Sequence, residues 1–185
     1  MTHLHLALIA AFLVAITHFD AMAQERNSPP PSADTSGLDF HHFGLLAVQD
    51  GGRRKPIDTF SRETLIRITG RSTYVGKAGR KWQANDFVLS GALETHDWRT
   101  EPMVLVSLGQ LKEKLGLDKT ERRFSFEQLV ASTELQRLTN EAHALKRAEK
   151  TLDRVQQEAL AVSDRLALLA NVMNGSALLI VPASK

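Results

Sequence analysis

The chain has 185 residues, which is enough for one domain with a substantial hydrophobic core but short for two. Its 23 basic and 21 acidic residues give a formal net charge of +2, so no global field attracts nucleic acid, although a pI near 9.0 allows local basic patches. The absence of cysteine excludes disulfide scaffolds, thiolate catalysis and thiolate metal sites. We therefore expect one domain without thiol chemistry and without a nucleic-acid partner.

Residues 1–23 have the features of a cleaved export signal. An apolar run from Leu6 to Ile16 is shorter than the roughly 20 residues that a membrane-spanning helix needs. Ala21-Met22-Ala23 then offers small residues where a signal peptidase cleaves. The preceding segment has His3 and His5 but neither Lys nor Arg, so an uncleaved membrane anchor remains the alternative. Both interpretations place the rest of the chain outside the cytoplasm, in a bacterial periplasm.

A single folded domain is expected after a flexible tether. Residues 24–37 are rich in Pro and Ser and poor in apolar side chains, so they cannot bury enough apolar surface to fold. Residues 38–185 carry the strand-like and helix-like patterns and form the predicted domain.

Residues 45–60, "LLAVQDGGRRKPIDTF", predict a strand, a tight turn and the start of a helix. Leu45 to Val48 form a short apolar run, and Asp50-Gly51-Gly52 is a turn signal in which either glycine can take a positive φ. Neither Gly-x-x-x-x-Gly-Lys-Ser/Thr nor Gly-x-Gly-x-x-Gly is present, so no phosphate-binding loop is indicated. The segment is instead predicted to be structural.

The second half of this segment is predicted to seat a helix and to display cations. Asp58 or Thr59 is placed to cap a helix over residues 59–69, whose apolar side faces a core. The three consecutive cations at 53–55 could present positive charge to an anionic partner. Alternatively, one of them could pair with Asp50 or Asp58 to fix the turn while the others are solvated.

Shorter elements are predicted in the middle of the chain. Residues 82–93 are predicted to form a short helix, and Met103 to Leu108 is the best strand candidate. Residues 109–117 predict a further short helix that ends at Gly116. A last helical turn is expected from Ser125.

The strongest periodicity runs from Thr133 to Asn174. It predicts one long amphipathic helix, or two helices in line, with coiled-coil-like packing. Residues 177–182, "ALLIVP", then predict a final strand that pairs with an earlier one. The expected fold is α+β, mainly helical, with a long amphipathic C-terminal helix and a small sheet of short strands. The apolar positions of the stripe are Leu135, Leu138, Ala142, Leu145, Ala148, Leu152, Val155, Ala159, Val162, Leu166, Leu169 and Met173.

Several segments together resemble a known family. "VQDGGR" from Val48 and "KPIDTF" from Lys55 are similar to the "VQD-GGR-KP-DTF" signature of the extracytoplasmic domain in fused Ccs-type cytochrome c biogenesis proteins, of the CcsBA/CcsA or ResBC kind. The resemblance extends over residues 45–182. Further similar segments follow in the same order: Ser72-Thr73-Tyr74 with Gly76, Asn85 to Ser90, Trp98, Pro102, Leu115-Gly116, the charged helix and the closing "LLIVP".

The resemblance implies an accessory periplasmic domain or subunit of cytochrome c maturation that is not catalytic by itself. In that family the domain belongs to a machine that moves haem outward and joins it to the Cys-x-x-Cys-His motif of apocytochrome c. The implied partners are a membrane-embedded Ccs-type synthase at the inner membrane and apocytochrome c, and haem would be reached through that complex. The family's tryptophan-rich haem-handling segment has no counterpart among these residues. The implied partner-binding or structural residues are Gln49, Asp50, Gly52, Arg53, Lys55, Pro56, Asp58, Thr59 and Phe60.

The histidines do not predict a metal site. His41 and His42 precede the first predicted strand, and adjacent side chains in extended backbone point to opposite faces, so both cannot easily hold one metal, although one could contact haem. His96, beside Trp98, and His143, on the polar side of the long helix, are interpreted as isolated structural residues. No acid, base and nucleophile set indicates an enzyme. The alternative function is a free-standing periplasmic adaptor that binds another protein through its long amphipathic helix.

Overall fold

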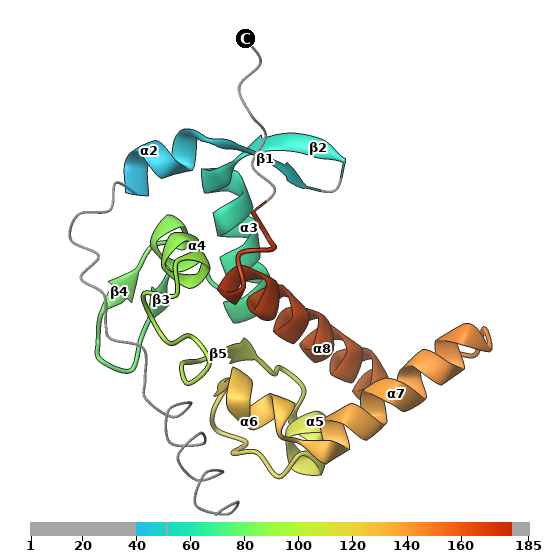
Figure 1. The fold of residues 1–185 in the computed structure, drawn as a ribbon. Helices are drawn as coiled ribbons and strands as arrows, with labels where there is room; N and C mark the ends of the chain where they lie inside the picture. Colours follow the sequence, from blue (N-terminus) through green and yellow to red (C-terminus); the bar gives the residue numbers. More distant parts are fainter. Residues whose placement is uncertain (1–39, 51, 179–185) are drawn as a thin grey trace, which may run out of the picture. The chain divides into compact units, whose positions relative to one another are not determined.

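The computed structural model describes residues 40–50 and 52–178 (Figure 1). These residues belong to one compact unit. The predicted export signal and tether lie outside the described residues, as does most of the predicted final strand. Within the described ranges, no helix has the length and apolar character needed to cross a membrane.

The described chain is an α+β fold that is mainly helical, which confirms the predicted fold class. Strands are short, and helices carry most of the packing surface. In chain order the elements are α2 Phe40–Leu45, β1 Ala47–Asp50, β2 Arg53–Pro56, α3 Ile57–Thr69, β3 Tyr74–Val75, β4 Lys81–Trp82, α4 Ala84–Ala92, β5 Pro102–Leu105, α5 Gly109–Lys114, β6 Arg123–Ser125, α6 Phe126–Val130, α7 Thr133–Arg147 and α8 Arg154–Met173.

The strands form three separate antiparallel pairs where one small sheet was expected. β1 pairs with β2, β3 with β4, and β5 with β6. The strand predicted from Met103 is present as β5, and its partner β6 follows after α5. The sequence did not predict β2, β3, β4 or β6, because strands as short as β3 or as charged as β2 show no apolar alternation.

Helices α3, α4 and α8 contact one another and, with β5, enclose the core. The approach between α4 and α8 is close: a Cβ on Gly91 would lie 2.8 Å from Cγ1 of Val172, so only glycine fits there without a shift. The largest fully buried side chains are Trp98, Phe87, Ile57, Leu65, Ile68, Met103, Leu111, Leu129 and Leu169.

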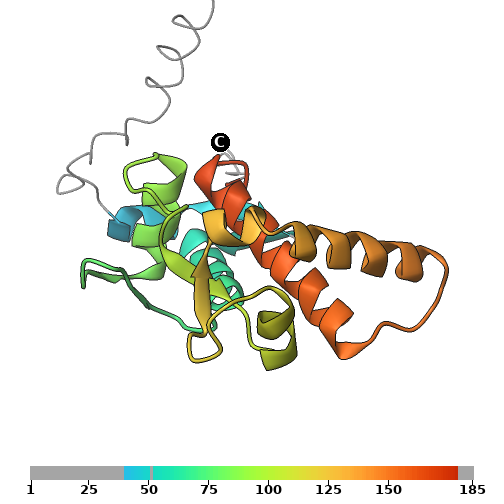
Figure 2. The same cartoon turned by 90° about the horizontal axis from the view of Figure 1, so that it is seen from below.

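The predicted long helix from Thr133 to Asn174 is two helices that fold back on each other, and neither one continuous helix nor two in line forms. α7 and α8 run in opposite directions and pack side by side (Figures 1 and 2). The break has a local cause: Asp153 caps α8 by accepting a hydrogen bond from the backbone N–H of Gln156 at 2.7 Å, and Glu149 takes a positive φ of 54°. The long C-terminal helix itself is present as α8.

Candidate functional site

The segment from Gln49 to Phe60 forms a β-hairpin followed directly by a helix. In the hairpin Gln49 lies opposite Arg54 and Asp50 opposite Arg53. Gly52 has a φ of 78°, as a glycine at a tight turn permits. The predicted strand, turn and helix are therefore present, as β1, the hairpin turn and α3.

An ion cluster braces this hairpin against α3. The ammonium of Lys55 lies 2.8 Å from Oδ2 of Asp50 and 2.6 Å from Oε2 of Glu63. Hydrogen bonding to Asp50 first, and to Glu63 second, raises the pKa of Lys55. The pairing with Asp50 matches the alternative in which one cation fixes the turn. Arg53 and Arg54 are exposed, and neither makes an ion pair with a carboxylate in the described part of the chain.

The predicted caps of α3 are wrong. Pro56 is the N-cap residue, and no side chain caps the helix. Asp58 is the second residue of the helix, and its carboxylate accepts hydrogen bonds from Nε and Nη2 of Arg62 at 2.9 and 3.2 Å. This guanidinium holds the pKa of Asp58 below its ordinary value. Thr59 is exposed and Phe60 is buried in the core.

Asp58 also connects α3 to α4. Nδ2 of Asn85 donates a hydrogen bond to Oδ1 of Asp58 at 3.3 Å. The space beside this contact is tight, because a Cβ on Gly44 of α2 would lie 2.7 Å from Nδ2 of Asn85. Oδ1 of Asn85 is buried and has no hydrogen-bond partner among the described residues. Two of the segments that carry the family resemblance, "KPIDTF" and "NDFVLS", therefore meet at one contact.

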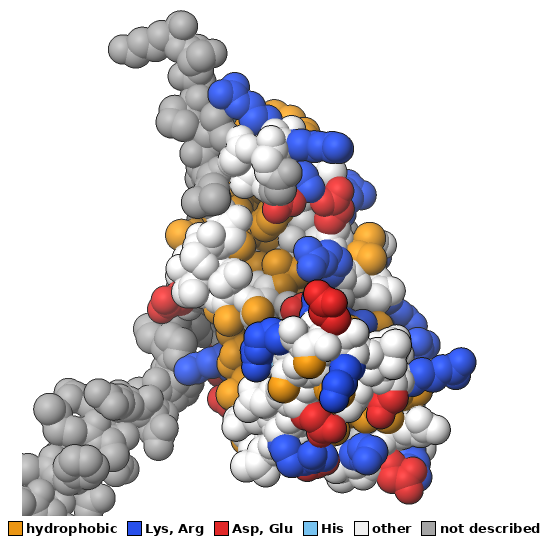
Figure 3. All heavy atoms as spheres, turned by 90° about the vertical axis from the view of Figure 1, so that its right-hand side faces the viewer, with side chains coloured by type: hydrophobic (Ala, Val, Ile, Leu, Met, Phe, Trp, Pro, Cys, Tyr) orange, Lys and Arg blue, Asp and Glu red, His pale blue; other side chains and the backbone are white. Residues whose placement is uncertain are grey.

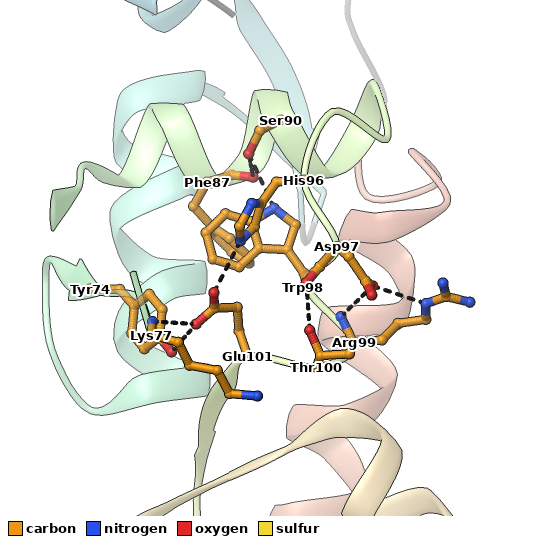
Figure 4. Close-up of polar contacts among 10 residues, drawn as sticks. All are labelled: Tyr74, Lys77, Phe87, Ser90, His96, Asp97, Trp98, Arg99, Thr100 and Glu101. Carbon is orange, nitrogen blue, oxygen red and sulfur yellow. Dashed lines mark hydrogen bonds and ion pairs between the residues drawn. The ribbon is translucent and has the colours of Figure 1, made fainter. Parts of the chain in front are cut away.

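A second cluster is built around Trp98 in the turn after α4 (Figure 4). Its indole Nε1 donates a hydrogen bond to Oγ of Ser90 at 3.1 Å. The ring meets Phe87, Trp82 and Tyr74 edge-on, at centroid distances of 4.9, 4.8 and 6.1 Å. Such edge-to-face pairs are favourable aromatic geometries, so the cluster joins the β3–β4 pair to α4.

Glu101 is the charged member of this cluster and is 6% exposed. Its Oε2 accepts hydrogen bonds from the hydroxyl of Tyr74 at 2.9 Å and from the backbone N–H of Lys77 at 3.0 Å. Nε2 of His96 lies 3.3 Å from Oε1. Burial, and then the bond to Glu101, raises the pKa of Tyr74 above its ordinary value. This network could not be predicted from the sequence, since nothing in the spacing links Tyr74 to Glu101.

The histidines are placed differently from the expectation. His41 and His42 lie in the helix α2, so the argument from extended backbone does not apply. His96 is not isolated, because its ring also lies 4.7 Å from that of Trp82 and 4.5 Å from that of Trp98. His143 is exposed on α7. In the described ranges no three His, Asp or Glu side chains are grouped closely enough to hold a metal ion.

Much of the amphipathic stripe of α7 and α8 is buried inside the fold. Leu135, Leu138 and Ala142 of α7 are buried, as are Val155 and Ala159 of α8. What remains open is a hollow of about 400 Å³ between α6, α7 and α8. It is lined by uncharged side chains: Phe126, Leu129, Val130, Leu135, Gln136, Thr139, Asn140, Ser163, Leu166, Ala167 and Ala170.

Comparison with known proteins gives one informative likeness. No family model matches the chain. Over 143 residues, or 76% of the chain, the sequence is 28% identical to protein NrfI of Wolinella succinogenes. The matched stretch is 15% of the length of that protein.

Proposed function

We propose that this chain is an accessory periplasmic domain or subunit of cytochrome c maturation that docks on a membrane-embedded synthase of the Ccs type. It carries no catalytic step of its own. Haem and apocytochrome c are handled by the complex, and this chain contributes a rigid docking surface. The likeness to NrfI and the resemblance of residues 45–182 to the Ccs-type extracytoplasmic domain support the proposal.

The observation that carries the proposal is the arrangement of the resembling segments. The hairpin β1–β2 is braced by the Asp50–Lys55–Glu63 cluster, and α3 is joined to α4 by Asp58 and Asn85. These contacts engage Lys55 and Asp58, whereas Arg53 and Arg54 are exposed on the hairpin. A braced hairpin with two unpaired guanidinium groups suits the recognition of carboxylates on a partner protein.

Deleting the gene tests the proposal. We expect covalent haem attachment to c-type cytochromes to fall while apocytochrome synthesis stays unchanged, as measured on haem-stained gels beside immunoblots of the apoprotein. Restoring the gene should restore the staining. Unchanged haem staining in the deletion strain would rule the role out.

The proposal also places the chain outside the cytoplasm. Cleavage after Ala23 would release a mature chain that begins at Gln24, because the apolar run before it is too short for a stable span. N-terminal sequencing of the protein from fractionated cells measures this directly. An intact chain beginning at Met1 in the membrane fraction would favour the anchor instead.

The second candidate, a free-standing adaptor for another protein, is favoured by the uncharged hollow between α6, α7 and α8. The two candidates predict different effects of a change in that hollow. Leu166→Asp would abolish partner binding by an adaptor, whereas the docking proposal places the essential contact at the hairpin. Whether a neighbouring reading frame encodes a multi-span protein with a tryptophan-rich periplasmic segment also separates them.

A further inference from the structure

The far end of the α7–α8 hairpin extends away from the rest of the described unit (Figures 1 and 2). α7 packs mainly against α8 and α6, and α6 lies beside the N-terminal part of α7. The C-terminal end of α7, residues 148–151 of the connection and the start of α8 are exposed to solvent. This end of the hairpin, residues 146–154, is called the hairpin tip below.

The hairpin tip concentrates positive charge. Four cations lie in these nine residues against two carboxylates, so the tip alone carries a formal charge of +2, equal to that of the whole chain. All four cations are exposed, and none makes an ion pair within the described residues. The cations are Lys146, Arg147, Lys150 and Arg154.

The two carboxylates already counted in this charge form no ion pair with the tip cations in the described part of the chain. Asp153 is occupied as the cap of α8, where it accepts the backbone N–H of Gln156. Glu149 makes no ion pair in the described part of the chain. By contrast, Arg137, nearer the start of α7, forms ion pairs with Glu134 at 2.8 Å and with Glu141 at 3.0 Å. Charge on α7 is therefore compensated near its beginning and uncompensated at its end.

The tip projects from the unit and carries no large exposed apolar side chain in the described residues, and both features restrict the kind of partner that it can bind. The large exposed apolar side chains of the described chain are Leu45, Leu46, Ile66, Val75, Leu93 and Val130, and none is at the tip. A protein partner usually needs an apolar or aromatic anchor in a fitted pocket, which this end does not offer. Cations on a projecting helix connection instead suit a flat, fluid surface whose anionic groups can rearrange around them. Figure 3 views the molecule from this side and shows exposed Lys and Arg side chains across the face, with Asp and Glu side chains between them.

We propose that the hairpin tip binds the surface of a lipid bilayer that contains anionic phospholipids. Lys146, Arg147, Lys150 and Arg154 lie among the headgroup phosphates, and no side chain enters the hydrocarbon. The interaction is electrostatic, so it weakens as salt screens the charges. The inference rests on the tip alone and does not depend on the proposed role in cytochrome c maturation.

Vesicle flotation of the full chain tests the proposal, with phosphatidylglycerol-containing vesicles compared with pure phosphatidylcholine vesicles. The measured quantity is the ratio of the two binding constants, so that any contribution of the apolar N-terminal run cancels. The test variant replaces all four tip cations with Gln. The control makes the same change in charge at four exposed cations elsewhere: Arg67, Lys77, Lys114 and Arg122. Circular dichroism confirms that both variants fold.

We expect the wild-type ratio to exceed one and to decline with added salt. Each cation removed from the tip should lower the ratio about fivefold, so the fourfold variant should lose nearly three orders of magnitude. The control variant should lose much less. An unchanged ratio in the tip variant, or an equal loss in the control, would overturn the proposal. Binding of the tip to polyglutamate without any preference for anionic vesicles would assign it to an acidic protein instead.

Discussion

Asn85 donates its side-chain amide to the carboxylate of Asp58 across 3.3 Å, and this contact joins two segments that lie 27 residues apart in the sequence. Asp58 is shared, because Arg62 binds the same carboxylate from the next turn of α3. Asn85 is confined by the chain at Gly44, where a side chain would collide with its amide. The start of α3 is thus fixed by α4 and α2 as well as by its own hairpin.

A double-mutant cycle should detect this contact. Asp58→Ala and Asn85→Ala each remove one partner, and their effects on the free energy of unfolding should couple by about 0.5 kcal/mol, at the low end for a hydrogen bond because Asp58 is partly solvated. Chemical denaturation of the two single variants and the double variant measures the coupling. A second cycle provides the control: it combines Asp58→Ala with Asn140→Ala, at an exposed asparagine on α7, and the two effects should be additive. Additivity for Asp58 and Asn85 would contradict the contact.

Gly52 of the hairpin turn has a left-handed backbone conformation. Its φ is 78°, and an added Cβ would meet no atom within 4 Å, so any cost of a side chain there is conformational. Gly52→Ala should destabilise the fold by about 1 kcal/mol, since an L-residue is strained in this region. Gly109→Ala is the matched control, because that glycine has equal space and no positive φ. Equal unfolding free energies for the two variants would show that the turn tolerates a side chain.

Tyr74 is the only tyrosine in the chain, so ultraviolet absorbance of tyrosinate reports on it alone. Its pKa is raised above 10.0 in the folded protein, chiefly by burial. A raised pKa means that the folded state holds this proton more tightly, so the stabilisation is complete below pH 10 and declines as the pH rises further. We expect tyrosinate to appear only together with unfolding. Tyr74→Phe should remove this part of the alkaline loss of stability, and an ordinary titration near pH 10 in folded protein would contradict the network with Glu101.

The elements with strong local signals could be predicted from the sequence. The glycine turn, α3, α4 and the strand near Met103 follow from residues adjacent in the chain, and all four are present. The contacts between elements could not be predicted, because the pairing of Tyr74 with Glu101 or of Asp58 with Asn85 depends on tertiary packing. The division of the predicted long helix was missed although Asp153 and Gln156 form a capping box, since the apolar spacing continues across the break. Asp58 was misassigned as a cap because Arg62, one turn further on, competes for its carboxylate.

Substitutions of two cations in the β1–β2 hairpin should distinguish a role in docking from a role in stability. Lys55 is bound by Asp50 and Glu63, so Lys55→Ala should lower the melting temperature. Arg53 has no such partner, and Arg53→Ala should leave the melting temperature near that of the wild type while covalent haem attachment falls. Arg71→Ala, which removes an exposed guanidinium outside the hairpin, is the control and should affect neither measurement. If Arg53→Ala melts early, the arginine serves the fold. If it melts normally and haem attachment is unchanged, the docking contact does not use Arg53, and Arg54, the other unpaired guanidinium of the hairpin, becomes the residue to replace.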